Sequence, residues 1–287
     1  MCMFTKQKQL LAEWFDAARS GNVEFIHANL AKLGGSVDKR KTDTSINSYF
    51  GFSAIHYAVV HEQLDVLKEV IEREYFLRLP QDQPIVAPAI GQRAQYIIRE
   101  GTSILHLALL VQNQRIVEFI LNYQHRSGKS ILCVPDSKGL FSVGILFMIQ
   151  TDEFVIRTLH SKQMEEELMY DYNGADAGPS HLHVAGIFGR FKLIEHLLEY
   201  IQAGLASVAF QQRIFNLALD ENRGHSTVDS CKIPMDIRRC NVQPNERQRC
   251  IEAMQTLVRT ANEYFSSLDQ IPDTPNKQYE NPVPSHV

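Results

Sequence analysis

Histidine and cysteine are the residues of this chain best suited to chemistry. Eleven histidines are present, and the His-x-His pair at His181 and His183 could hold a metal ion or move a proton. Residues two apart point to nearly opposite sides of a helix, so this pair cannot share one ion. His56, His106 and His183 each stand two residues before an alanine. Because a residue that returns at one place of a pattern is best explained by that place, we predict a structural role for these three.

The cysteines offer a zinc site as the next hypothesis. Cys231, Cys240 and Cys250, with His225, are the nearest candidates, but they follow each other at spacings of nine and ten residues. Zinc ligands within a pair are usually separated by about two to four residues. We therefore expect free cysteines that behave as small apolar side chains, and we predict no metal and no cofactor. Their odd number, five, fits a reducing compartment.

Sequence patterns typical of catalysis are missing. The chain has no Gly-x-Ser-x-Gly, no glycine-rich phosphate loop ending in lysine, and no His-Glu-x-x-His. We predict that the protein is not an enzyme and name no catalytic residue. An active site assembled from distant residues stays open as the alternative.

The elements that carry the recurring histidines form a repeat. The phrase Gly-x-Ser-x-x-His-x-Ala stands at residues 51–58, 101–108 and 178–185. Each copy leads to a second apolar segment with helical spacing, at residues 66–71, 116–121 and 193–198. The pattern predicts helix-turn-helix units. Such units must stack, because one helix pair cannot bury its apolar face alone.

The repeated phrase resembles the Thr-Pro-Leu-His-x-Ala pattern of ankyrin repeats. The resemblance implies an all-α fold, an ankyrin-repeat solenoid of about six helix-turn-helix units with insertions. The fourth unit is degenerate, with Gly144 in place of the histidine, and the last is predicted from Pro234-Met235-Asp236-Ile237. The units are expected near residues 11–33, 51–71, 101–121, 136–159, 178–199 and 231–260.

Irregular spacing of the copies predicts two large insertions in a repeat domain at residues 1–265. The first, near 72–98, contains prolines that forbid a continuous helix. The second, near 200–230, is apolar enough to form an extra helix on the stack. The proline-rich segment 266–287 is expected to be disordered or extended. It ends in Ser285-His286-Val287, which resembles a ligand of a PDZ-type partner.

The composition limits the kinds of partner that the protein can be expected to bind. The formal net charge of −4 and the lack of a long basic stripe argue against nucleic acid. No apolar run approaches the roughly 20 residues of a membrane-spanning helix. The start of the chain lacks the layout of a secretory signal, because acidic residues interrupt its apolar run. We therefore expect a soluble cytoplasmic protein.

The ankyrin resemblance implies that the protein binds another protein, as an adaptor or scaffold, through turn tips and a concave face. We expect an exposed apolar row on that face. The alternative is that an insertion or the tail covers it. A second alternative is an effector that intracellular bacteria inject into host cells, acting on a host protein in the host cytoplasm, with an unrecognised enzymatic activity in its insertions. The predicted contact residues are Tyr49, Phe50, Phe52, Val60, His61, Arg99, Glu100, Leu110, Val111, Lys138, Leu140, Met148, Ile149, Ile187 and Phe188.

Overall fold

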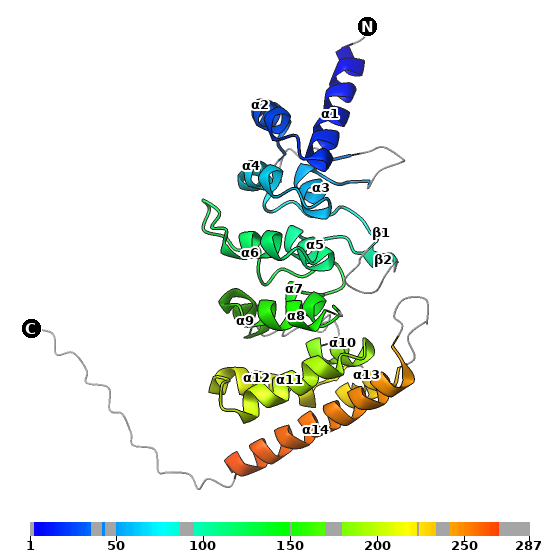
Figure 1. The fold of residues 1–287 in the computed structure, drawn as a ribbon, viewed down its shortest axis with the longest axis vertical. Coiled ribbons are helices and arrows are strands. Elements are labelled where there is room, and N and C mark those ends of the chain that lie inside the picture. The colour runs from blue at the N-terminus through cyan, green and yellow to red at the C-terminus, as the bar shows by residue number, and fades with distance from the viewer. Residues whose placement is uncertain are drawn as a thin grey trace, which may run out of the picture.

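The fold was examined in a computed structural model that describes residues 3–35, 42–43, 50–86, 95–149, 151–169, 180–222, 224–233 and 242–269. This part of the chain is mostly helical with a few short strands, in agreement with the all-α prediction. Its helices are stacked in layers along one axis, with α1 at one end and α14 at the other (Figure 1).

Consecutive helices group into six layers, which we call units 1 to 6. Unit 1 has α1 (Met3–Ser20) and α2 (Val23–Leu33); unit 2 has α3 (Ala54–Val60) and α4 (Leu64–Glu74); unit 3 has α5 (Ile104–Val111) and α6 (Gln114–Asn122). Unit 4 has α7 (Ser142–Leu146), α8 (Asp152–Leu159) and α9 (Lys162–Met169). Unit 5 has α10 (His181–Ile187), α11 (Phe191–Gln202) and α12 (Val208–Leu219), and unit 6 has α13 (Thr227–Lys232) and α14 (Pro244–Asp269).

The first helix of every unit packs on the first helix of the next. These inner helices, α1, α3, α5, α7, α10 and α13, form one continuous row of contacts. The second helices lie on the other side of the stack, where α2 contacts α4 and α11 contacts both α8 and α14. Apolar side chains from both rows build one core along the axis, with Trp14 and Tyr57 among its largest buried members.

The repeated phrase works as a turn followed by a helix cap. Its glycine has a positive φ, 82° at Gly51 and 81° at Gly101, a conformation that glycine adopts most easily. The serine then caps the inner helix: the Ser103 side chain accepts the His106 backbone N–H, while His106 Nδ1 accepts the Ser103 N–H at 3.3 Å. Two backbone donors that a helix start leaves unpaired are thereby satisfied.

The same cap shows where unit 6 begins. Gly224 has a φ of 76°, and Ser226 caps α13 together with Asp229, whose carboxylate accepts the Ser226 N–H at 3.3 Å. The last unit, expected near residues 231–260, therefore begins earlier than predicted, because Cys231 already lies within α13 near its end. The segment Pro234–Ile237 lies outside the described residues.

The two insertions differ in structure. The first contains a β-hairpin in which β1 (Gln83–Val86) pairs antiparallel with β2 (Gln95–Ile98), and it projects from the inner-helix side of the stack (Figure 1). The second contains α12, which packs on α9 and α14 and confirms the predicted extra helix. It continues with β3 (Glu221–Asn222), paired with β4 (His225–Ser226).

Three boundaries depart from the predictions. Helix α1 begins at Met3, well before residue 11, and α9 adds a helix that the degenerate fourth unit gave no reason to expect. Helix α14 continues to Asp269, past the predicted domain end at 265. Residues 270–287, with the PDZ-like terminus, lie outside the described residues. Among the described helices, none is both long and apolar enough to cross a membrane.

Candidate partner-binding site

The tips of the unit turns are exposed as predicted. Phe50 keeps 44% of its surface exposed directly before Gly51, and Glu100 and Lys138 are also exposed at the next two turns. Arg99 is half-buried and pairs with Asp82 at 2.8 Å, and Asp82 also accepts the Glu100 N–H at 2.8 Å. Tyr49 lies outside the described residues.

Successive turns are hydrogen-bonded to each other. Ser137 N, in the turn of unit 4, donates to Glu100 O, in the turn of unit 3, at 2.8 Å. Arg78 donates to Gly101 O at 3.2 Å and to Pro135 O at 3.0 Å, so its guanidinium joins the same two turns. The turn tips of units 3 and 4 are therefore held in a fixed position relative to each other.

Four predicted contact residues are buried, which corrects the expectation of an exposed apolar row. Phe52 is fully buried and packs against Tyr57, with ring centres 5.3 Å apart. Leu110, Met148 and Ile149 are at most 3% exposed and belong to the core. Tyr96 of β2 reaches Met148, its hydroxyl 4.0 Å from the Met148 sulfur, so the hairpin covers part of this row. At this contact the first insertion lies against the expected row.

A half-buried strip remains on the inner-helix side. His61 of this strip lies with its ring centre 6.2 Å from Tyr57, and its pKa is lowered by burial and then by the positive charge of Arg19. The side chains of this strip are partly covered, and the rest of their apolar surface is open to a partner. Its members are Val60, His61, Val111, Leu140, Ile187 and Phe188.

His106 and His183 bond to backbone atoms of the next unit, in line with the structural role predicted for the recurring histidines. His106 Nε2 lies 3.0 Å from Leu140 O, and His183 Nε2 lies 2.9 Å from His225 O. Leu140 and His225 each follow the turn glycine of the next unit, so the two bridges are equivalent. Burial lowers the pKa of His106 to about 4, with Arg78 adding to the effect, so its ring stays neutral and fit for this bridge.

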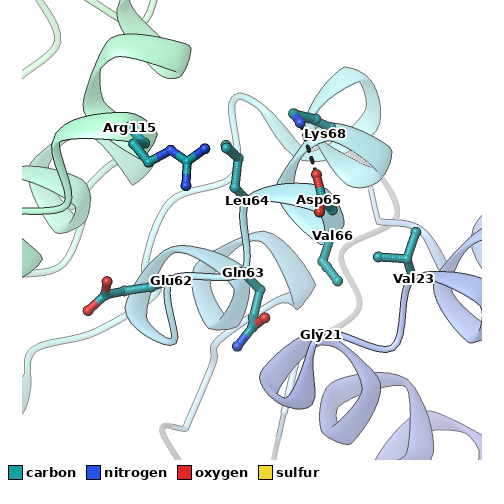
Figure 2. Close-up of a pocket in the computed structure, with 9 residues that line it drawn as sticks. All are labelled: Gly21, Val23, Glu62, Gln63, Leu64, Asp65, Val66, Lys68 and Arg115. Atoms are coloured by element: carbon teal, nitrogen blue, oxygen red, sulfur yellow. Dashed lines mark hydrogen bonds and ion pairs between the residues drawn. The ribbon is translucent and has the colours of Figure 1, made fainter.

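A first hollow, of about 300 Å³, lies where the two helices of unit 2 meet (Figure 2). Figure 2 shows Arg115 of unit 3 pointing toward it and Lys68 paired with Asp65 at 2.9 Å. Glu62 accepts a hydrogen bond from Asn113 at 2.6 Å, which ties the same turn to unit 3. The lining residues are Gly21, Val23, Glu62, Gln63, Leu64, Asp65, Val66, Lys68 and Arg115.

A second hollow, of about 210 Å³, lies at the same position of unit 5. Arg190 is buried there and pairs with Asp152 of unit 4, and Lys192 approaches the same carboxylate at 3.4 Å. Glu62 and Gly189 occupy equivalent places in the two hollows and share a left-handed backbone, with φ of 60° and 64°. The sequence predicted neither hollow. The left-handed residue is Glu62 at one position and Gly189 at the other, so the two turns share no residue pattern that marks them.

Two buried glutamates also escaped the sequence. Glu74 accepts the backbone N–H groups of Gly35 and Ile55, each at 2.8 Å. Glu167 of α9 accepts the Ser142 N–H at 3.1 Å and so caps α7, whose own N-cap residue Phe141 has no side-chain acceptor. Burial raises the pKa of Glu167 to about 7. No sequence signal marks either of them, because Glu74 follows Glu72 and Arg73 and Glu167 follows Glu165 and Glu166.

The zinc hypothesis can be tested only in part. Cys231 and Cys250 approach each other, their sulfurs 3.6 Å apart, but Cys240 lies outside the described residues and the backbone oxygen of His225 accepts the bridge from His183. In the described ranges, no three or more His, Cys, Asp or Glu side chains form a group able to hold a metal ion.

No protein-family model and no curated protein matches this chain.

Proposed function

We propose that this chain is an ankyrin-repeat adaptor, which binds a partner protein through its row of turn tips and the half-buried strip beside them. The observation that carries the proposal is the shared register of the two histidine bridges, 3.0 Å from His106 to Leu140 O and 2.9 Å from His183 to His225 O. A fixed bridge between units presents their turn tips at regular intervals, and that arrangement suits recognition of an extended protein surface.

The chemistry of the tips supports a partner with both apolar and charged groups. Phe50 is the most exposed aromatic side chain among the large hydrophobic residues of the described chain. Exposed aromatic and arginine side chains dominate the binding energy of protein interfaces. Lys138 and Glu100 add one charge of each sign at the neighbouring tips. The proposed contact surface is therefore Phe50, Arg99, Glu100 and Lys138, with the half-buried strip.

A cytoplasmic location belongs to the same proposal. Cys133, Cys231 and Cys250 are free thiols in the structure. Free thiols that approach within 3.6 Å without bonding fit a reducing compartment.

The proposal is tested by comparing proteins captured by the full chain and by a tip variant. Phe50→Ala combined with Lys138→Glu should keep the melting temperature, because both side chains are exposed. We expect at least a tenfold loss of the specifically captured protein in quantitative mass spectrometry, corresponding to about 1.4 kcal/mol or more.

The matched control is Lys162→Glu, an exposed charge reversal on α9, away from the turn tips. It should capture the partner like the unaltered chain. Equal loss in the control, or full capture by the tip variant, would contradict the proposed surface.

A further inference from the structure

Two buried thiols face each other in the last unit of the stack. Cys231 lies in α13 and Cys250 in α14, and their sulfurs are 3.6 Å apart, so the two side chains are in direct contact. Both residues are fully buried. The Cys250 sulfur also lies 4.0 Å from the backbone oxygen of Gly186, in α10. The pair therefore stands where three helices of units 5 and 6 meet.

A glycine of α10 makes room for this contact. A Cβ at Gly186 would lie 3.0 Å from the Cys231 sulfur and 3.2 Å from the Cys231 backbone nitrogen. The two sulfurs of a disulfide are about 2.0 Å apart, so Cys231 and Cys250 would have to approach by about 1.6 Å to form one. Rotation about the two Cα–Cβ bonds can supply a movement of this size.

The surroundings distinguish the two sulfurs. The hydrogen bond with Cys231 lowers the pKa of the Cys250 thiol, and the positive charges of Arg247 and Arg190 lower it further, against the opposing effect of burial. The same hydrogen bond, together with burial, raises the pKa of the Cys231 thiol. The thiolate is the form that attacks an oxidant. Cys250 is therefore suited to react first, and Cys231 to react with the product.

A small oxidant can approach Cys250 through the second hollow, the one of about 210 Å³. Glu246 lines this hollow and lies one helical turn before Cys250 on α14. Arg190 lines it too, and its buried Nε has no hydrogen-bond partner among the described residues. An N–H group of this kind can donate to a peroxide oxygen.

We propose that Cys231 and Cys250 form a redox modification site, which hydrogen peroxide converts into a reversible disulfide between α13 and α14. The Cys250 sulfur attacks one peroxide oxygen and the O–O bond breaks. Cys250 becomes a sulfenic acid, and the other oxygen leaves as water with the proton of the Cys250 thiol. The Cys231 sulfur then attacks the Cys250 sulfur and the S–O bond breaks. A second water leaves with the Cys231 proton, so the two sulfurs lose the two electrons that the peroxide oxygens gain.

The disulfide gives the last layer of the stack a second form. In the reduced form, non-covalent contacts hold α14, among them the hydrogen bonds from Arg247 to Cys231 O at 2.9 Å and to Ile233 O at 2.7 Å. A covalent bond between the two cysteines closes the chain between them and keeps α14 on α13. Free thiols in a reducing compartment and a disulfide under peroxide are then two states of one site.

The test exposes the reduced full chain to a small excess of hydrogen peroxide, blocks the remaining thiols with N-ethylmaleimide and digests the protein with trypsin without a reductant. Lysine and arginine residues separate Cys231, Cys240 and Cys250 into different tryptic peptides, so a cross-link identifies its two partners. We expect mass spectrometry to find the Cys231–Cys250 pair as the main product, and dithiothreitol to release it.

Serine variants test the order of the two steps. Cys231→Ser should leave Cys250 as a sulfenic acid that dimedone traps, whereas Cys250→Ser should leave Cys231 unoxidised. Cys133→Ser is the matched control, because burial raises the pKa of the Cys133 thiol to about 11 and keeps it protonated. This variant should form the cross-link as the unaltered chain does.

The result on the unaltered chain does not depend on the folding of any variant. No cross-link, a cross-link that joins Cys240 instead, or oxidation of Cys133 before the pair would overturn the proposal. A Cys231–Cys250 bond that forms only in urea would overturn it as well, because the reaction would then belong to the unfolded chain.

Discussion

The interface between units 3 and 4 and the interface between units 4 and 5 solve the same packing problem with different chemistry. Between units 3 and 4, a neutral His106 bridges to Leu140 O, and Thr151 donates to Gln112 at 2.7 Å. Between units 4 and 5, Asp152 pairs with Arg190, and two histidines share a hydrogen bond. The first interface has hydrogen bonds to backbone and neutral side-chain groups, including those of the Arg78 guanidinium, but no ion pair among the contacts described above, whereas the second has an ion pair and a pair of histidines.

Leu140 and His181 occupy the space around Gly144, the residue that stands in unit 4 where the bridging histidine stands in unit 3. A Cβ at Gly144 would lie 2.6 Å from a Leu140 methyl and 3.5 Å from His181 Nδ1. The His181 ring is buried beside Phe147, and burial lowers its pKa to about 3, with Arg213 contributing. His181 therefore fills, as a neutral ring, space next to the position that a unit-4 histidine would need.

The largest effect is expected from the ion pair of the second interface. Asp152→Ala removes the ion-pair partner of the buried Arg190 guanidinium. It should lower the free energy of unfolding by about 3–5 kcal/mol, because the charge of Arg190 stays buried without that carboxylate. Thr151→Ala, next to it but exposed and bonded to unit 3, should change it by less than about 0.5 kcal/mol. Urea denaturation of both variants gives the comparison. Equal effects would mean that the two interfaces do not differ in this way.

The neutral bridge of the first interface should have a smaller effect. His106→Ala leaves Leu140 O and the cap of α5 without their partner, at a cost of about 1–3 kcal/mol. His27→Ala removes an exposed histidine and should cost less than about 0.5 kcal/mol. Thermal and urea unfolding measure both. A His106→Ala protein as stable as the His27→Ala control would refute the structural role of the bridge.

Two buried groups, His106 at the first interface and Glu167 inside unit 4, should respond to pH in opposite directions. The folded pKa of His106, about 4, is below the unfolded value of 6.5, so its contribution to stability is full above pH 6.5 and is lost as pH falls toward 4. The folded pKa of Glu167, about 7, is above the unfolded value of 4.5, so its contribution is full below pH 4.5 and is lost as pH rises through 7.

Glu167→Gln should therefore flatten the loss of stability between pH 5 and 8, by an amount on the order of 1–2 kcal/mol. Glu166→Gln, an exposed neighbour on α9, should keep the pH profile of the unaltered chain. The free energy of unfolding of both variants and of the unaltered chain, measured across this pH range, tests this prediction. A profile that Glu167→Gln does not change would show that the pKa of Glu167 is the same in the folded and unfolded states.

The smallest effect tests whether unit 6 follows the register of unit 4. Gly139 and Gly224 have φ of 77° and 76°, and neither can be replaced by a β-carbon residue without strain. Gly139→Ala and Gly224→Ala should each cost about 1 kcal/mol, the price of a left-handed alanine. Unfolding in urea measures both. A neutral Gly224→Ala would contradict its assignment as the turn glycine of unit 6.

Local sequence was sufficient where the repeat kept its residues. The phrase around His56, His106 and His183 predicted stacked helix pairs and a structural role for its histidines, because one short segment carries both the turn glycine and the cap of the inner helix. The phrase failed at unit 6, where Asp229 replaces the histidine and Cys231 replaces the alanine. Asp229 still caps its helix together with Ser226. The capping role of this position is therefore kept although the residue is an aspartate and not a histidine.

Contacts between distant residues could not be predicted. The burial of Met148 depends on Tyr96, which belongs to an insertion 52 residues earlier in the chain. The meeting of His160 with His196 depends on the stacking of α8 on α11, and neither residue belongs to the repeated phrase. Among the predicted contact residues, Phe50, Glu100 and Lys138 at the turn tips are therefore exposed, whereas those that the hairpin and the core enclose are buried.

Helix α14 has a consequence for how separate molecules meet. Its 26 residues span about 39 Å, and it lies against α11, α12 and α13 (Figure 1). Met254, Leu257 and Ala261 face those helices and are buried, while Glu252, Gln255, Arg259 and Glu263 face water. A stack that ended in a bare apolar layer would attract its own copies end to end. This amphipathic helix instead gives that end a hydrated, charge-bearing surface, which opposes fibre-like self-association at high concentration.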